Sequence, residues 1–429
     1  MRILMINELS VKGGTEVQTH REKAYFREKG HEVFLLTFDE SLPVKLTGNE
    51  VNYPNQFRFA SGIYHKFFID KQNVGRLREI IDGLGPDVIH INNVWKAALD
   101  VMEAVGKYPV VQTIRDYGAV CPKATCVHED GMVCRGYENE DCRDCIRKSV
   151  RLRLKYRSLR KFNQARKKAV DYFVSPSQAL ADMCSRNLLP TACLNNPFDF
   201  SKIKNSGKVP GARKVFLYYG MIAPKKGVDR FLEVLRGYRS ADMEVWFAGE
   251  IEKGYGTAFL NQAAEIPFVS YLGVKSFDEI MELYPRVYCV VVPSYWIENY
   301  PNTALEAVAN KTIVIGSGRG GIPEIIRDER LLFDILDLDS FRKCLDYVLQ
   351  MGKEEYGIIT EQMFEYLQMH NTQERYYERL LEIYRTIGSG PDRGSRNGGR
   401  IPAHGEAREG GIPAEKNMSG STQKSEQER

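Results

Sequence analysis

The 429-residue sequence predicts an α/β protein with two Rossmann-like domains that face a central cleft. Short β-branched runs alternate with amphipathic stretches in the first half of the chain, and the same alternation resumes in the second half. Strands that alternate with helices build parallel sheets with helices on both faces. A stretch rich in Asn, Pro, Gly and Lys at residues 195–214 separates the two halves.

The expected elements follow from these runs. We expect first-half strands at residues 2–6, 33–37, 88–91 and 110–114, and helices at 15–29 and 72–82. Second-half strands are expected at residues 214–219, 244–248, 269–272, 287–292 and 312–316. The predicted organisation is a domain at 1–195 with a cysteine-rich insert at 118–146, a linker at 196–213, a second domain at 214–371 and a helix at 372–387. Residues 388–429 are rich in Gly, Ser and charge, so we expect a disordered tail.

The composition is that of an ordinary soluble protein, with 43% apolar and 27% charged residues. The formal net charge of +4 is small and says little about partners. The apolar run at residues 3–6 is too short for the core of a signal peptide. No stretch approaches the roughly 20 apolar residues that a membrane-spanning helix needs. We therefore expect a cytoplasmic protein, and contact with a membrane surface stays open.

The most informative segment is residues 290–325, where a buried strand ends at Pro293 and a helix begins near Asn302. Ligands of doubly wound sheets bind beyond the carboxyl ends of the strands. A helix N-terminus offers phosphate free backbone N–H groups and a positive dipole end. The carboxylate of Glu298, in the loop, would accept hydrogen bonds from sugar hydroxyls. The carboxylate of Glu306, in the helix, would accept them from a ribose diol. The alternative is two solvated charges.

This segment resembles the donor site of retaining glycosyltransferases of family four, which have the two-domain fold called GT-B. The matching residues are ENYPNTALE at 298–306 and the Gly-Gly turn within GSGRGGIPEI at 316–325. The resemblance covers residues 1–387 and is strongest in the second half of the chain. It implies that Glu298 holds the hydroxyls of the donor sugar and that Glu306 holds the ribose.

The other donor-site assignments also come from this resemblance. The stretch GMIAPKKGVDRFLEVL matches a strand, turn and helix in which Lys226 contacts the donor diphosphate. Met221 stands where the family usually has arginine. The remaining donor-binding residues that the resemblance implies are Gly14, Gly220, Gly249, Val274, which contacts the base through its backbone, and Asn302 and Thr303, which offer backbone N–H groups.

Arg115 is the third expected catalytic residue, beside Glu298 and Lys226. It lies in TIRDYGAVCP, where many relatives have a histidine that touches the transferred sugar. Arginine can hold a hydroxyl or a phosphate, but it cannot act as a base. The alternative for Arg115 is an ion pair with Asp116 or another acidic residue.

Five of the nine cysteines fall between Cys121 and Cys145. In a cytosolic chain such a cluster indicates metal or redox chemistry before structural disulfides. The spacing of Cys142 and Cys145 suits a tetrahedral ion, and Cys121 and Cys134 could complete a structural zinc site. Many relatives carry cysteines at these four positions. The alternatives are reduced cysteines, disulfides or an iron–sulfur cluster. The resemblance implies no catalytic metal, because GT-B enzymes neutralise the diphosphate with helix N-termini and basic side chains.

Residues 146–170 contain many Lys and Arg, interleaved aliphatic and aromatic residues, and no acidic residue. A basic amphipathic helix is typical of contact with an anionic membrane surface. The alternative is a helix whose aliphatic residues pack inward and whose charges are solvated. No nucleic-acid partner is expected, because no recognised nucleic-acid module accompanies the basic residues.

The predicted function is retaining transfer of a sugar from a nucleotide-sugar donor to a glycan or lipid-linked acceptor, in surface polysaccharide or glycolipid synthesis. The alternative is a degenerate transferase that binds sugar nucleotides or serves as an assembly partner. Met221 and Arg115, which depart from the family pattern, favour that alternative.

Overall fold

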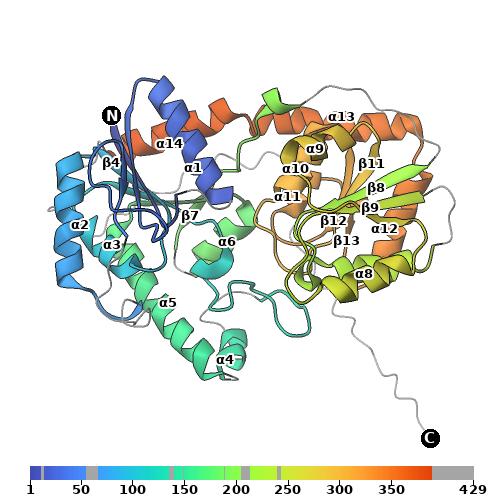
Figure 1. The fold of residues 1–429 in the computed structure, drawn as a ribbon, viewed down its shortest axis with the longest axis horizontal. Coiled ribbons are helices and arrows are strands. Elements are labelled where there is room, and N and C mark those ends of the chain that lie inside the picture. Colours follow the sequence, from blue (N-terminus) through green and yellow to red (C-terminus); the bar gives the residue numbers. More distant parts are fainter. Residues whose placement is uncertain are drawn as a thin grey trace, which may run out of the picture.

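A computed structural model describes residues 1–10, 14–54, 66–134, 140–147, 149–187, 189–203, 213–238 and 243–388. These residues form two parallel sheets with helices packed against them (Figure 1). The first sheet has the order β3-β2-β1-β4-β5-β6-β7, and the second has the order β10-β9-β8-β11-β12-β13. The predicted α/β fold with two Rossmann-like domains is confirmed.

The first domain contains seven strands and six helices of the described chain. The strands are β1 (Arg2–Asn7), β2 (Glu32–Thr37), β3 (Glu50–Asn52), β4 (Val88–Asn93), β5 (Val110–Thr113), β6 (Tyr172–Ser175) and β7 (Thr191–Cys193). The helices are α1 (Gly14–Glu28), α2 (Lys71–Leu84), α3 (Ala98–Ala104), α4 (Glu140–Arg147), α5 (Val150–Ala169) and α6 (Gln178–Arg186).

Strand β1 lies inside the first sheet because it is apolar on both of its faces. Leu4 and Ile6 belong to the core under α2 and α3, whereas Ile3 and Met5 belong to the core on the opposite face. All four side chains are fully buried. The sequence of a strand that is covered on both faces is a continuous run of apolar residues, as in β1.

The second domain is built around one continuous hydrophobic core. Its strands are β8 (Lys214–Tyr219), β9 (Met243–Ala248), β10 (Val269–Tyr271), β11 (Val287–Val292), β12 (Ile313–Ser317) and β13 (Leu332–Phe333). Its helices are α7 (Val228–Leu235), α8 (Gly256–Ala264), α9 (Phe277–Leu283), α10 (Asn302–Ala309), α11 (Ile322–Ile326), α12 (Leu338–Gln350) and α13 (Lys353–His370).

The nine strands expected from the sequence are present, each within two residues of its expected bounds. Strands β3, β6, β7 and β13, which have only two to four residues each, were not predicted. Residues 389–429 of the expected tail and residues 204–212 of the expected linker lie outside the described residues.

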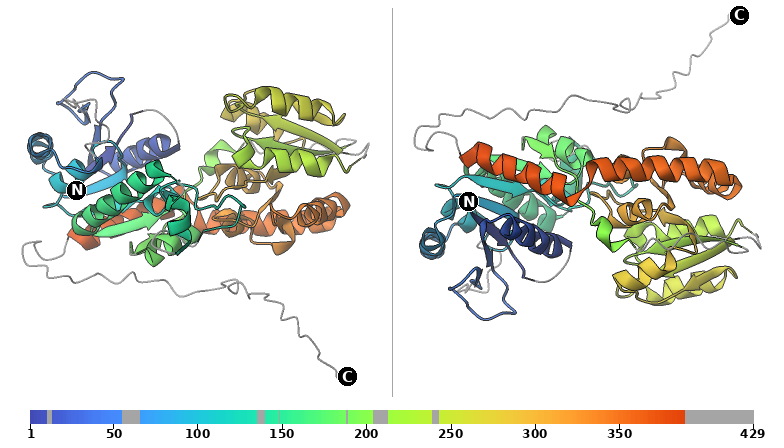
Figure 2. Two further views of the ribbon diagram at one scale, coloured as in Figure 1. Left: turned by 90° about the horizontal axis from the view of Figure 1, so that it is seen from below. Right: turned by 90° about the horizontal axis from the view of Figure 1, so that it is seen from above.

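The last helix, α14 (Gln373–Gly388), returns to the first domain. Figure 2 shows α13 running along the second domain and α14 along the first. Tyr377, Leu380 and Tyr384 of α14 are buried in one core cluster with Phe26 of α1 and with the strands of the first sheet. Helix α14 therefore ties the two domains together through apolar packing.

Leu380 tests the contribution of this return helix. Its side chain is fully buried, and a Leu→Ala change in a core costs about 2–5 kcal/mol. We expect Leu380→Ala to lower the urea midpoint of unfolding clearly. Met369→Ala is the control, because Met369 is 65% exposed near the end of α13. Equal midpoints for the two variants would contradict the packing role of α14.

Candidate active site

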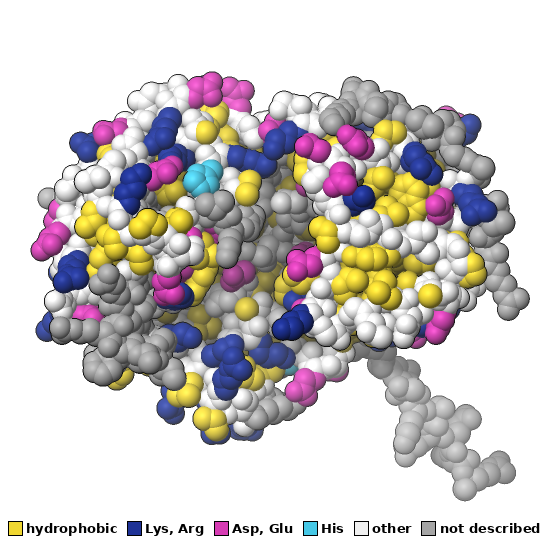
Figure 3. All heavy atoms as spheres, in the orientation of Figure 1, with side chains coloured by type: hydrophobic (Ala, Val, Ile, Leu, Met, Phe, Trp, Pro, Cys, Tyr) yellow, Lys and Arg dark blue, Asp and Glu magenta, His cyan; other side chains and the backbone are white. Residues whose placement is uncertain are grey.

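The candidate active site lies where the carboxyl ends of the two sheets face each other. Arg115 follows β5, and Asn299 lies in the loop after β11. The side-chain Nδ2 of Asn299 donates to the backbone oxygen of Arg115 at 2.5 Å. At the start of α6, the backbone N–H groups of Gln178 and Ala179 donate to the carboxylate of Glu324 in α11, each at 2.8 Å. The molecular surface is hollowed between the two domains on the face that Figure 3 shows.

Glu298, in the loop that follows β11, is held by hydrogen bonds at one of its oxygens. The Lys226 ammonium forms an ion pair with Oε1 at 2.6 Å. The hydroxyl of Ser294 and the indole N–H of Trp296 donate to the same Oε1 at 2.5 Å and 3.0 Å. The structure therefore joins two of the three predicted catalytic residues, and sequence reasoning missed Ser294 and Trp296. The indole and hydroxyl donors fix the direction of the carboxylate.

Lys226 reaches this position because the chain turns tightly at Gly227. Gly227 has φ 73°, and a Cβ there would stand 1.6 Å from the backbone oxygen of Pro293. Only glycine allows this approach. The turn places the Lys226 ammonium 4.7 Å from the centre of the Trp296 ring, which is a cation–π geometry.

The N-terminus of α10 lies next to this pair along the chain. Pro301 is its N-cap residue, and no side chain caps the helix there. The backbone N–H groups of the predicted residues Asn302 and Thr303 are the first two of the helix, where N–H groups have no partner within the helix. They are suited to bind a phosphate group.

Glu306 lies further into α10 and is partly buried. The Tyr219 hydroxyl, at the end of β8, donates to Glu306 Oε2 at 2.6 Å and lies 2.8 Å from the Tyr284 hydroxyl. Burial raises the pKa of Glu306 to about 7, although the hydrogen bond from Tyr219 opposes this shift. The sequence predicted Glu306 but did not single out the two tyrosines.

The remaining donor-domain candidates lie just beyond the ends of three neighbouring strands. Gly220 follows β8 and Gly249 follows β9, and a Cβ on Gly249 would stand 1.9 Å from the Gly220 backbone oxygen. This close approach requires glycine at residue 249 whatever ligand is bound. Val274 follows β10 and is 68% exposed, and Met221 is 43% exposed. Both are therefore accessible at the strand ends.

Arg115 is turned into the first domain. Its Nη2 donates to Asn92 Oδ1 at 2.7 Å and lies 3.3 Å from Glu22 Oε1. Glu22 is fully buried in α1 and also accepts a hydrogen bond from the hydroxyl of Tyr376 in α14, at 3.0 Å. Burial raises the pKa of Glu22, and the Arg115 charge opposes that rise. The ion pair weighed as the alternative for Arg115 is present, with Glu22 as the acid. Gly14, the other first-domain candidate, begins α1.

The cysteines of the predicted zinc site lie in the first domain, and Cys121, Cys134 and Cys142 are near enough to Cys126 to raise the pKa of its thiol. Cys121, Cys126 and Cys134 are buried in the hydrophobic core, and Cys145 lies beside His128 with 3.7 Å between Sγ and Nδ1. Among the described residues, no group of three or more His, Cys, Asp or Glu side chains could hold an ion. All nine cysteines lie in the described part of the chain, and none forms a disulfide. The predicted zinc set, which also includes Cys142, therefore has no support in the structure.

The basic segment 146–170 is divided between two helices rather than forming one. Ser149 is extended and caps α5 by accepting a hydrogen bond from the Leu152 N–H, whereas α4 ends at Arg147. Val150 and Leu154 are exposed on α5, and Leu159 is buried. Within the described ranges, no helix has the length and apolar character that a membrane crossing requires.

Comparison with known proteins identifies the class. The family description Glycosyltransferase Family 4 matches residues 12–192, and Glycosyl transferases group 1 matches residues 199–362. The chain is therefore a glycosyltransferase with the GT-B fold. It belongs to the family of group 1 and family 4 glycosyltransferases.

Solved structures and a curated relative agree with this placement. Sucrose-phosphate synthase from Thermosynechococcus elongatus aligns over 90% of this chain and 98% of its own, with a TM-score of 0.68 and 15% identity. Anabaena HepE in complex with UDP aligns over 90% of this chain and 100% of its own, with a TM-score of 0.67 and 14% identity. A 42.6 kDa protein in the cps region of Klebsiella pneumoniae is 25% identical over 372 residues, which are 79% of this chain and 92% of that protein.

Glu306 makes the stability of the protein depend on pH. Its pKa rises from the ordinary 4.5 to about 7 on folding, so the folded state binds more protons than the unfolded state between these values. Stability conferred by the neutral carboxyl is therefore lost as the pH rises through this range. We expect the free energy of unfolding of wild type, relative to Glu306→Gln, to fall by about 3 kcal/mol between pH 4.5 and 7.5. Urea unfolding of both proteins over this range measures the difference, and parallel pH profiles would contradict it.

Proposed function

We propose that this chain is a retaining glycosyltransferase that uses a uridine diphosphate sugar as donor. The observation that carries the proposal is the Lys226–Glu298 pair, which lies at the carboxyl end of the second sheet beside the uncapped N-terminus of α10. Anabaena HepE, which has the same fold, is solved with UDP, and this supports uridine as the base.

The donor would bind with its diphosphate at Lys226 and at the N–H groups of Asn302 and Thr303. Lys226 would then pair with phosphate, and Glu298 would be released to accept hydrogen bonds from sugar hydroxyls. Glu306 would accept bonds from the ribose diol. Negative charge builds on the departing diphosphate, so donors that are already aimed there accelerate the reaction.

The transfer step needs no nucleophile from the protein. The bond between the anomeric carbon and the phosphate oxygen breaks, and a bond from the acceptor oxygen to the same carbon forms on the same face of the sugar. The proton of the acceptor hydroxyl passes to the departing phosphate oxygen. In this role Arg115 holds the first-domain wall of the cleft through Asn92 and Glu22 and does not act as a base.

We further propose a glycan or lipid-linked acceptor and a role in surface polysaccharide or glycolipid synthesis. The relative in the cps region of Klebsiella pneumoniae supports this assignment. The exposed basic side chains of α5, together with Val150 and Leu154, support a cytoplasmic protein that contacts the inner face of the membrane. Such contact would bring a lipid-linked acceptor to the first domain.

Substitutions at the pair test the donor site. We expect Lys226→Ala and Glu298→Ala each to lower sugar transfer from a labelled UDP-sugar by about 100-fold, the scale of losing one preorganised charged contact. Lys225→Ala is the matched control, because the neighbouring Lys225 pairs with Glu252 at 2.7 Å.

The outcome also separates the two candidate functions. Transfer by Lys226→Ala at the level of Lys225→Ala would contradict the proposed site. Thermal stabilisation of the wild type by UDP, without turnover of any UDP-sugar, would instead favour the sugar-nucleotide-binding alternative.

Flotation with liposomes tests the membrane contact. Each basic residue near an anionic surface contributes about 1 kcal/mol, and salt screens this attraction. We expect the protein to float with anionic liposomes at low salt, and to be released at high salt or from neutral liposomes. Reversing two exposed charges in Arg153→Glu/Lys155→Glu should weaken binding about tenfold or more. Equal binding to anionic and neutral liposomes, or none to either, would contradict the proposal.

A further inference from the structure

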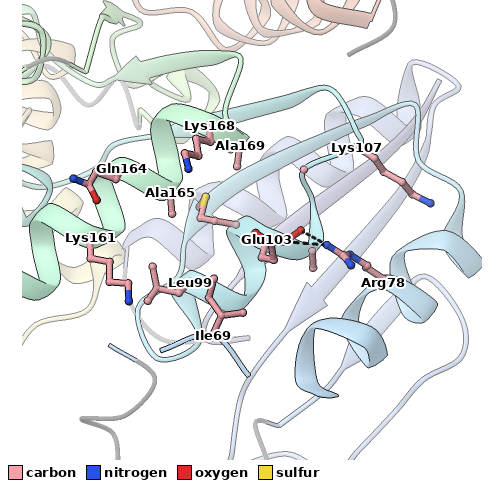
Figure 4. A pocket seen from close by; sticks show the side chains of 13 residues that line it. Ile69, Arg78, Leu99, Glu103, Lys107, Lys161, Gln164, Ala165, Lys168 and Ala169 are labelled. Atoms are coloured by element: carbon pink, nitrogen blue, oxygen red, sulfur yellow. Dashed lines mark hydrogen bonds and ion pairs between the residues drawn. The ribbon is translucent and has the colours of Figure 1, made fainter. Parts of the chain in front are cut away.

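A pocket of about 660 Å³ lies in the first domain, outside the cleft. Its walls come from α3 and α5, with Ile69 just before α2 and Arg78 within α2 (Figure 4). All of its lining residues belong to these helices or to the segments beside them, and none comes from the carboxyl end of a strand. The pocket is therefore separate from the donor site, and its size is that of a small-molecule site.

The face of α5 that lines the pocket has an unusual pattern. Lys161, Gln164, Ala165 and Lys168 follow one another at the i, i+3, i+4 and i+7 spacing of a single helix face. The face of a helix that packs against a neighbour is normally apolar. Here a lysine stands at each end of that face, roughly 10 Å apart along the axis, with the small Ala165 between them.

The charges around the pocket are mostly positive. Lys161, Lys168, Arg78 and Lys107 line it, and Glu103 is the one acidic residue among its described lining residues. Lys107 forms an ion pair with Asp82 at 2.8 Å, and the Lys161 ammonium donates to the backbone oxygen of Phe67. Arg78 and Glu103 form a pair at 3.3 Å in which each side chain is about half exposed, and such surface pairs contribute little to stability. An incoming phosphate could therefore compete for Arg78. The net charge suits an anionic ligand.

The floor and the rim of the pocket are apolar. Leu99 and Met102 of α3 are buried beneath it, and Ile69 is 40% exposed at its edge. Phe68 is 54% exposed beside it, with the Lys161 ammonium 5.3 Å from the centre of its ring. Lysines above an apolar floor match a molecule that has one anionic group and an attached hydrocarbon chain.

We propose that this pocket binds a single anionic phospholipid. Lys161 and Lys168 hold the phosphate, and the first part of the acyl chains covers the exposed side chains of Ile69 and Phe68. This inference goes beyond the proposed transfer reaction and does not depend on it. It also differs from a general attraction of α5 to charged membranes, because it requires particular residues of one face of the helix.

Binding of short-chain lipids below their micelle-forming concentration tests the site in the full-length protein. We expect dihexanoyl phosphatidylglycerol to bind at least tenfold more tightly than dihexanoyl phosphatidylcholine, measured by calorimetry. Lys168→Glu should weaken binding of the anionic lipid about tenfold or more. Lys167→Glu is the matched control, because Lys167 is an exposed neighbour on α5 that does not line the pocket, and it should change binding less than about threefold.

Two results would replace the lipid site with a different kind of binding. Equal weakening by Lys167→Glu and Lys168→Glu would show diffuse attraction and overturn the site. Inorganic phosphate that binds as tightly as the anionic lipid would show a free-phosphate site and would overturn the lipid assignment.

A third variant, Ala165→Phe, fills the space between the lysines without changing charge. It should abolish lipid binding while the thermal unfolding temperature stays near that of wild type. Undiminished lipid binding by this folded variant would contradict a ligand seated between Lys161 and Lys168.

Discussion

The contact between the two domains is the constraint on which the candidate site depends. The carboxylate of Glu324 in α11 accepts hydrogen bonds from the first N–H groups of α6, so a negative charge meets the positive end of a helix from the other domain. The contact from Asn299 to the Arg115 backbone lies beside it in the cleft. Because both contacts come from segments that follow strands β11 and β12, they bring the loop of Glu298 to face the first domain.

The side chains proposed to bind the donor are held in place by contacts within the protein. Lys226 and Glu298 neutralise each other, and Ser294 and Trp296 fix the carboxylate. Such an arrangement keeps two charges in place in a partly buried site, where an unpaired charge would be costly. Binding of a diphosphate would exchange one anionic partner of Lys226 for another, so little reorganisation is needed at the moment of reaction.

Arg115 stands where many relatives have histidine, and the tertiary structure gives it buried partners in the first domain. Arg115 is drawn inward by Glu22, and Glu22 is in turn bonded to Tyr376 of the returning helix α14. The wall of the cleft and helix α14 therefore share one buried polar network. A carboxylate that is fully buried needs such partners, since burial alone disfavours its charge.

The sequence by itself determined the strand pattern and the two-domain fold, because apolar periodicity is a property of neighbouring positions. A local motif also led to the prediction of Lys226, Glu298 and Glu306 as site residues, and the structure pairs Lys226 with Glu298. It missed β3, β6, β7 and β13, since strands of two to four residues carry too short a pattern. Other features depend on residues that only folding brings together. Tyr219 reaches Glu306 across 87 positions, and Glu22 meets Tyr376 across 354. The cysteine spacing suggested zinc, but the described residues include no group of His, Cys, Asp or Glu side chains that could hold an ion. Spacing in the sequence shows which possible ligands are close along the chain, whereas tertiary packing determines which side chains are close in space.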